Sequence, residues 1–243
     1  MTAFRREDAL RARLSGFRRM VEQAEREVAE AIAEHRGTAG AAVAWSGGKD
    51  SLVCLDLLAR AGGGTALYSD DELIEPGGEW YARETAEDLG LRYRHVLGWA
   101  RHGGWFDPWR QAPYWRPMPE AEHIGGLIEP WQLAQGYSPV ILGLRGQEAI
   151  RRRHNARRGT TYVVADGGVR CQPLRNWKIG DVWAYLADRG LEPNPWYARM
   201  TAAGIPRDMQ RVGPLPMAPR WVLAQTDLML LRKLEERYGR RWS

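Results

Sequence analysis

The chain has 243 residues, of which 44% are hydrophobic, and a formal net charge of +5 at pH 7, which suits a single well-buried domain with helical additions. It contains only two cysteines, which excludes a disulfide framework, a structural four-cysteine zinc site and an iron–sulfur cluster held by four cysteines of one chain. No signal peptide pattern and no run near the ~20 apolar residues of a membrane span occur, so we expect a cytoplasmic protein without a membrane partner.

An amphipathic helix is predicted over residues 7–34, because apolar side chains recur at alternating steps of three and four and charged residues fill the other face. The apolar positions are Leu10, Leu14, Phe17, Val21, Ala24, Val28 and Ile32. We assign residues 1–36 to this N-terminal segment. It either covers the sheet of its own chain or forms the contact of a homodimer.

The most informative segment is 41–58, where a predicted strand breaks into the turn SGGKDS and the apolar pattern resumes at helical spacing. Gly47 and Gly48 allow a tight turn that brings amide N–H groups close to an anion, and the helix behind them directs the positive end of its dipole to the same point. The predicted phosphate cradle is completed by the side chains of Ser46, Lys49 and Ser51.

This turn differs from the Walker pattern G-x-x-x-x-G-K-[ST], since Val43 stands at the first glycine position and Asp50 follows Lys49. Transfer of a terminal phosphate, as in kinases and GTPases, is therefore not indicated. Asp50 is a candidate to orient Mg²⁺ or its waters beside the phosphates. Alternatively, it is only an acidic residue that the helix dipole favours in the first turn.

Short strands and helices alternate after this turn. We predict a strand over 66–69 that leads into an acidic turn at Asp70, a helix over 78–89 and a strand over 92–97. This order predicts an α/β fold with a doubly wound, mostly parallel, Rossmann-like sheet, whose ligands lie at the carboxyl ends of the strands. Asp70 would lie on that edge, as a candidate for the adenosine side or the metal.

Residues 99–138 have a different composition, rich in Trp, Pro and Gly, and four of the chain's twelve tryptophans fall within 99–115. Long irregular segments of compact domains are often lids or binding loops, and aromatic rings interleaved with arginines could stack on a base. A loop packed by its own indole rings is an equal alternative.

A buried strand is predicted over 139–144, and it delivers the chain to Arg145 and a basic run, 145–158, with six arginines against one glutamate. Such a cluster indicates a polyanion site, for nucleotide phosphates or nucleic acid. The later arginines, Arg157 and Arg158, could equally be a solvated surface.

Two of these patterns resemble a known family. SGGKDS after a strand is similar to the PP-loop of the adenine nucleotide α-hydrolases, which include ATP pyrophosphatases and phosphoadenosine-phosphosulfate (PAPS) reductases. The PAPS reductase branch carries G-x-R-x-x-E-S-x-x-R, which this chain matches, with Ala149 in place of the serine, at Gly143, Arg145, Glu148 and Arg152. The resemblance implies an adenine-nucleotide-binding domain over 37–215, with these four residues and the loop at the phosphates. Segments 172–183 and 190–197 also resemble the family and are mainly scaffold.

The chain departs from the reductases at its C-terminus. They use a cysteine of an E-C-G-[LI]-H element, whereas this chain ends in RKLEERYGRRWS, and Arg211-Val212-Gly213-Pro214 stands where many relatives have R-x-G-C. We interpret Cys54 as a core residue, and Cys171 could be a reactive thiol only if basic neighbours lower its pKa. Thiol-based reduction is therefore disfavoured.

Three functions stay open. The leading one is ATP-dependent, Mg²⁺-assisted adenylyl transfer or ATP pyrophosphatase activity on an unidentified acceptor, with Lys49, Asp50 and Arg145 as catalytic residues. The first alternative is sulfuryl transfer or hydrolysis acting on PAPS or adenylyl sulfate. The second is an accessory protein that binds a nucleotide and nucleic acid. A C-terminal helix over 216–243, with Trp221, Leu228, Leu231, Leu234 and Tyr238 at helical spacing, caps the sheet or meets a partner.

Overall fold

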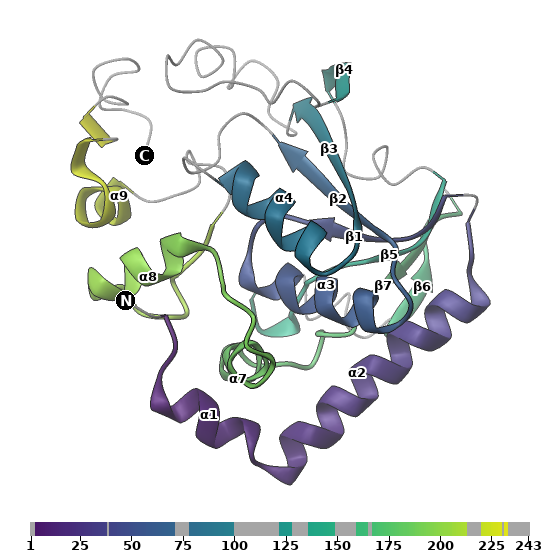
Figure 1. Ribbon diagram of the computed structural model, residues 1–243, viewed down its shortest axis with the longest axis horizontal. Coiled ribbons are helices and arrows are strands. Elements are labelled where there is room, and N and C mark those ends of the chain that lie inside the picture. The colour runs from purple at the N-terminus through teal and green to yellow at the C-terminus, as the bar shows by residue number, and fades with distance from the viewer. Residues whose placement is uncertain are drawn as a thin grey trace.

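We describe a computed structural model of the chain, and the description covers residues 3–37, 39–70, 78–99, 122–127, 136–148, 159–164, 167–212, 220–229 and 231–232. The order of elements is given in Figure 1. The strands are β1 (Gly40–Trp45), β2 (Thr65–Asp70), β3 (Arg92–Trp99), β4 (Glu122–Leu127), β5 (Tyr137–Ile141), β6 (Thr161–Val163) and β7 (Val169–Cys171). The helices are α1 (Arg6–Ala12), α2 (Ser15–Glu34), α3 (Lys49–Arg60), α4 (Gly78–Asp88), α7 (Ile179–Arg189), α8 (Pro195–Ala202) and α9 (Arg220–Thr226), with a 3₁₀ turn, η2, at Gly146–Glu148.

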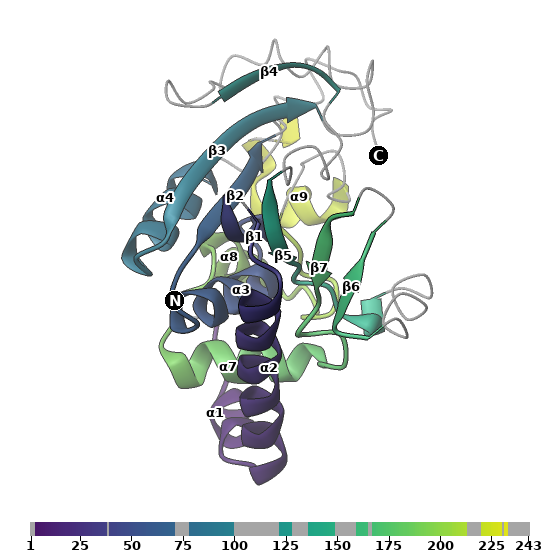
Figure 2. The ribbon, with the colours of Figure 1, turned by 90° about the vertical axis from the view of Figure 1, so that its right-hand side faces the viewer.

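The strands form one sheet in the order β4-β3-β2-β1-β5-β7-β6, which Figure 2 shows from the side. All neighbouring pairs are parallel except β6 with β7. The strand order reverses at β1, whose neighbours are β2 and β5. In such sheets the crevice beyond this switch point is the usual ligand site. The predicted α/β, mostly parallel fold is therefore confirmed.

Helices α3 and α4 pack on strands of the sheet, α2 packs on β5, β7 and α3, and α7 packs against α3 and α1. Helix α3 is almost entirely buried, and its residues Leu52, Leu55 and Leu58 are 0% exposed. Cys54 is also 0% exposed, as predicted for a core residue. This tight packing fixes the first turn of α3, which contains the last three residues of the SGGKDS sequence.

The N-terminal segment differs from its prediction, because residues 7–34 form two helices that meet at an angle (Figure 1) rather than one. Phe17, Ala24 and Val28 of α2 are buried as predicted, whereas Leu10 and Leu14 are more than half exposed. In α1 the inward side chains are instead Asp8 and Ala12, since α1 packs on α7 and forms ion pairs with Asp181 of α7 and with Arg207. Charge pairing therefore determines which face of α1 is buried, and the spacing of apolar residues does not predict such pairing.

Other predicted elements are close to the observed ones. The helix predicted over 78–89 is α4, and the strands predicted over 66–69 and 92–97 are β2 and β3. The strand predicted over 139–144 ends three residues earlier, at Ile141. The segment 99–138 is not only a loop, because it contains β4, which pairs with β3. Strand β6 was also absent from the prediction.

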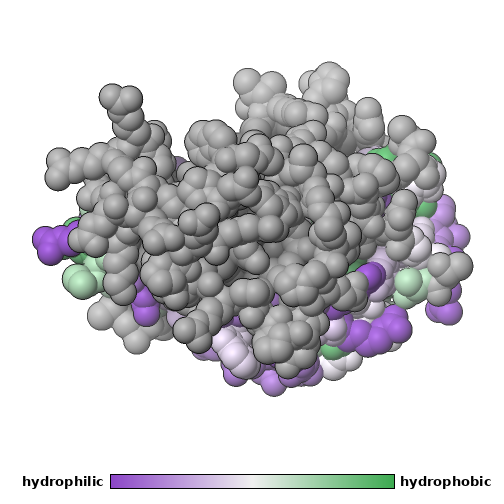
Figure 3. All heavy atoms as spheres, turned by 90° about the horizontal axis from the view of Figure 1, so that it is seen from above, coloured by the Kyte–Doolittle hydropathy of each residue, from purple (hydrophilic) through white to green (hydrophobic). Residues whose placement is uncertain are grey.

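The described residues of the C-terminal stripe are buried to different degrees. Leu231 is buried, but Leu228 is 48% exposed, and Leu223 of α9 takes the buried position instead. No helix of the described residues is long and apolar enough to cross a membrane. The described residues visible in Figure 3 are mostly hydrophilic, with hydrophobic ones scattered singly among them.

Candidate nucleotide site

The SGGKDS loop closes on itself between the end of β1 and the start of α3. Gly47 has a φ of +72°, a conformation that side chains other than glycine rarely adopt. The Ser51 hydroxyl lies 3.0 Å from the Ser46 hydroxyl and donates to the Gly48 carbonyl at 3.0 Å. These contacts preorganise the turn at the N-terminus of a 12-residue helix. Whether the turn binds phosphate stays a prediction.

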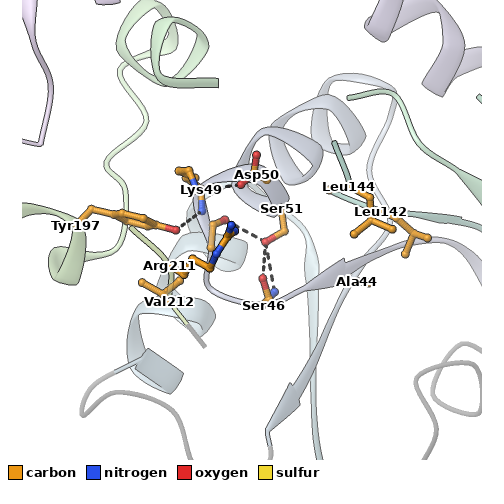
Figure 4. Close-up of a pocket in the computed structure, with 12 residues that line it drawn as sticks. Ala44, Ser46, Lys49, Asp50, Ser51, Leu142, Leu144, Tyr197, Arg211 and Val212 are labelled. Carbon is orange, nitrogen blue, oxygen red and sulfur yellow. Dashed lines mark hydrogen bonds and ion pairs between the residues drawn. The ribbon is translucent and has the colours of Figure 1, made fainter. Parts of the chain in front are cut away.

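A cavity of about 340 Å³ opens over this loop. Its lining comes from the end of β1 and the loop, the β5–η2 connection, α8 and the segment after α8: Ala44, Ser46, Gly48, Lys49, Asp50, Ser51, Leu142, Gly143, Leu144, Tyr197, Arg211 and Val212. In Figure 4, Tyr197 approaches Lys49 from one side, while Leu142 and Leu144 lie on the opposite side of the two serines. One end of the cavity is thus polar and cationic, and the other is apolar.

Lys49 is buried at the base of the site, with only 3% of its surface exposed. Its ammonium lies 3.1 Å from an Asp50 carboxylate oxygen and donates to the Gln210 carbonyl at 3.4 Å, 5.3 Å from the centre of the Tyr197 ring. Burial lowers the pKa of Lys49 from its ordinary value, and the charge of Asp50 opposes that shift. Its amide donates to the Tyr197 hydroxyl at 3.2 Å.

Asp50 pairs with two cations, because its other carboxylate oxygen accepts a hydrogen bond from Nε of Arg145. Arg145 is 4% exposed. The structure thus brings together the three residues predicted to be catalytic, as one charge cluster. Arg211 adds a further charge, since its proximity also lowers the pKa of Lys49.

Mg²⁺ bound at this loop would have one carboxylate, Asp50, from the residues that line the cavity. In the described part of the chain, no group of three or more His, Cys, Asp or Glu could hold a metal ion by itself. A single carboxylate still fits Mg²⁺, which is commonly held by one or two carboxylates together with substrate phosphates and water. Asp50 would then share its charge between the ion, Lys49 and Arg145.

Gly143 lies against the first turn of α3. A Cβ at this position would come within 2.7 Å of the Asp50 carbonyl carbon and the Ser51 nitrogen, so only glycine fits here. The predicted association of Gly143 with the loop is therefore explained by close backbone packing. The glycine brings the β5–η2 connection, and with it Arg145, up to the phosphate turn.

Sequence reasoning missed the far wall of the site. Tyr197 was assigned to the scaffold, and Gln210 was not singled out, although one contacts the Lys49 amide and the other its ammonium. Arg211 and Val212 had been considered only as replacements for a cysteine motif. The motif similarity around Tyr197 could have drawn attention to it, whereas nothing in the local sequence marks the Gln210 carbonyl.

Several predicted site residues are not tested by these contacts. Asp70 ends β2 beside β1, and Glu148 ends η2, but their side chains lie outside the described residues. Arg152 and the rest of the basic run also lie outside them. The hypothesis of nucleic-acid binding by this run therefore stays a prediction.

The two cysteines are both buried at 0% exposure and are absent from the cavity lining. Burial raises the pKa of Cys54 well above its ordinary value and that of Cys171 to about 12. A reactive thiol requires a lowered pKa, but burial of Cys171 in β7 raises its pKa by more than the nearby charge of Arg175 lowers it.

Comparison with known families identifies the family to which this chain belongs. The model of the phosphoadenosine phosphosulfate reductase domain matches residues 40–217. The chain belongs to this family. The match begins at β1 and includes the loop, Gly143, Arg145, Tyr197 and Arg211, so nearly every element of the cavity is part of the family domain.

The fold is similar to that of a solved structure of low sequence identity. The PAPS reductase from Candida auris, in a phosphate complex, is 17% identical, with a TM-score of 0.51 over 82% of this chain and 93% of that one. The NH₃-dependent NAD synthetase from Campylobacter jejuni is 14% identical (TM-score 0.45; 93% and 94% covered). The FMN adenylyltransferase from Candida glabrata is 15% identical (TM-score 0.45; 71% and 55% covered). No curated protein sequence matches the chain.

Proposed function

We propose that this family member binds ATP over the SGGKDS loop and cleaves it between the α- and β-phosphates, which transfers AMP to an acceptor and releases pyrophosphate. The observation that carries the proposal is the cavity itself, which places a helix N-terminus, two hydroxyls and the cations Lys49 and Arg211 around one space without a thiol. These groups suit a polyphosphate and its leaving group, and they supply no nucleophile of their own.

The reaction balances without a covalent enzyme intermediate. An oxygen of the acceptor attacks the α-phosphorus, the bond to the bridging oxygen breaks, and pyrophosphate leaves with the electron pair. The loop amides and Lys49 stabilise the charge that develops on this leaving group, because donors fixed in a buried site need no reorganisation during the reaction. Mg²⁺, when bound with the nucleotide at Asp50, supplies further charge neutralisation at the phosphates.

A second candidate is binding and turnover of PAPS or adenylyl sulfate, which the family match over residues 40–217 favours. Guanidinium groups recognise sulfate and phosphate equally well, so Arg145 and Arg211 fit both candidates. Reduction by a protein thiolate has no support from this geometry, since the two cysteines of the chain lie in the core with raised pKa values.

The test is a pair of calorimetric titrations in Mg²⁺, one with ATP and one with PAPS, on the wild type and on Lys49→Ala. Lys178→Ala is the matched control, because Lys178 is exposed and remote from the cavity lining. We expect ATP to bind the wild type and the control, and Lys49→Ala to lose at least about tenfold in affinity. The rate of pyrophosphate release should also fall in Lys49→Ala.

Preference for PAPS over ATP would replace the first candidate by the second. Binding of neither nucleotide would overturn both. ATP binding that Lys49→Ala leaves intact would show that the loop is not the phosphate site.

A further inference from the structure

The wall that contacts Lys49 is tied to the N-terminal helix, which lies outside the family domain. Arg207 makes a two-pronged ion pair with Asp8 of α1, through NH1 to Oδ1 at 2.5 Å and NH2 to Oδ2 at 2.7 Å. NH2 also donates to the Ala3 carbonyl at 2.8 Å, and the guanidinium lies 4.6 Å from the centre of the Trp183 ring. Asp8 is 2% exposed, so water screens this pair little.

Arg207 belongs to a turn that leads directly to the site. The amide of Gln210 donates to the Arg207 carbonyl at 3.3 Å, and the Gln210 carbonyl accepts the hydrogen bond from the Lys49 ammonium. The Gln210 side chain donates to the Ile205 carbonyl at 2.8 Å and holds the other end of the turn. The chain of contacts from Asp8 to Lys49 therefore contains two residues, Arg207 and Gln210.

The residues after this turn, Arg211 and Val212, line the cavity. The position of Arg207 thus affects the hydrogen bond to Lys49 and also the placement of a cation and an apolar side chain at the cavity wall. A second ion pair joins α1 to the scaffold elsewhere, between Arg11 and Asp181 of α7 at 2.6 Å. Because the Arg11–Asp181 pair already attaches α1 to the domain, the Asp8 contact is not needed for that attachment.

We propose that Asp8 and Arg207 are positioning residues for the nucleotide site, through which the N-terminal helix holds the 206–212 segment against Lys49. The part of this inference that concerns ATP affinity rests on the proposed function. The part that concerns the enclosure of Lys49 does not.

Asp8→Asn is the first variant, and Asp181→Asn is its matched control. Both aspartates are buried, both join α1 to the rest of the domain through an ion pair with an arginine, and both accept a hydrogen bond from the backbone at a helix N-terminus, from Arg5 or Lys178. Both variants should lower the melting temperature, because each removes one charge of a buried or half-buried pair. Only Asp8→Asn removes the two-pronged ion pair of Arg207, which then keeps the hydrogen bond to the Ala3 carbonyl and a 3.9 Å ion pair with Glu7.

The first readout is acylation of lysine amines followed by peptide mass spectrometry, which is well suited to this chain because it has only three lysines. Lys178 is exposed and is the internal reference within each sample. In Asp8→Asn we expect Lys49 labelling, relative to Lys178, to rise about tenfold, as Gln210 moves away from the ammonium. Asp181→Asn should leave the ratio at the wild-type value.

The second readout is calorimetric titration with ATP and Mg²⁺ at a temperature where circular dichroism shows each variant folded. Asp8→Asn should bind ATP about tenfold more weakly than Asp181→Asn. If the wild type binds no ATP, the proposed function fails, while the labelling result still decides the positioning role. Equal Lys49 labelling in the two variants would overturn the positioning role.

Arg207→Lys covers the case in which Asp8→Asn does not fold. Lysine keeps the charge beside Asp8 but cannot span both carboxylate oxygens and the Ala3 carbonyl as the planar guanidinium does. We expect an intermediate rise in Lys49 labelling. Wild-type labelling in Arg207→Lys would contradict the proposal.

Discussion

Replacing Gly143 by alanine tests whether close packing of the β5–η2 connection on α3 maintains the site. The added Cβ would lie 2.7 Å from the Asp50 carbonyl carbon and the Ser51 nitrogen, and 2.9 Å from the Asp50 carbonyl oxygen. Carbon contacts are favourable at about 3.5–4.0 Å, so the two backbones must separate by about 0.8 Å or more. Overpacking of this kind costs about 1–3 kcal/mol. In a chain of this size, that lowers the melting temperature by about 2–12 °C.

The assay is thermal unfolding followed by circular dichroism, together with ATP titration at a temperature where the variant is folded. We expect both a lower melting temperature and weaker binding, because the displaced backbone carries Asp50 and Ser51. Gly16→Ala is the control, since a Cβ at Gly16 in α2 meets nothing within 4 Å and alanine favours the helix. A Gly143→Ala protein with wild-type melting temperature and ATP affinity would refute this reasoning.

Two further predictions follow from the site and the core. Tyr197→Phe removes the acceptor of the buried Lys49 amide and should cost about 1–3 kcal/mol in a urea unfolding experiment, with weaker ATP binding; unchanged stability and affinity would contradict the assigned contact. The Cys171 thiol has a pKa of about 12 when folded and a lower ordinary pKa, so its contribution to stability is complete below about pH 9 and is lost as pH rises toward 12. Cys171→Ala should therefore lose less stability than the wild type between about pH 8 and pH 10, as measured by urea unfolding at both values. An equal loss in both proteins would show that the folded thiol ionises normally.

The phosphate loop could be predicted from sequence because all its determinants are local. An apolar strand, two glycines and a helical apolar pattern lie within 18 consecutive residues, and each constrains the backbone of its neighbours. Gly143 and Arg145 were found through a resemblance, and the structure gave each a physical reason. The loop and the β5–η2 connection were therefore within reach of sequence reasoning.

The other wall was beyond that reasoning, since its contacts depend on tertiary packing. Tyr197 is 148 residues from Lys49, and the group of Gln210 that contacts Lys49 is a backbone carbonyl, which every residue type has. Likewise, an apolar pattern does not predict that Asp8 turns inward, because burial of a carboxylate is favourable only with a partner such as Arg207.

The charge cluster explains why the cavity fits a polyanion. Among the described residues of the cluster, Lys49, Arg145 and Arg211 carry positive charge and Asp50 carries negative charge. Buried cations are costly to remove from water unless anionic oxygens replace the lost hydration. The loop amides at the N-terminus of α3 add partial positive charge at the same place. The anionic oxygens of a phosphate chain would therefore suit this cationic end of the cavity. Both ATP and PAPS meet this condition, so the charge of the cavity supports the proposed nucleotide binding but does not favour one nucleotide over the other.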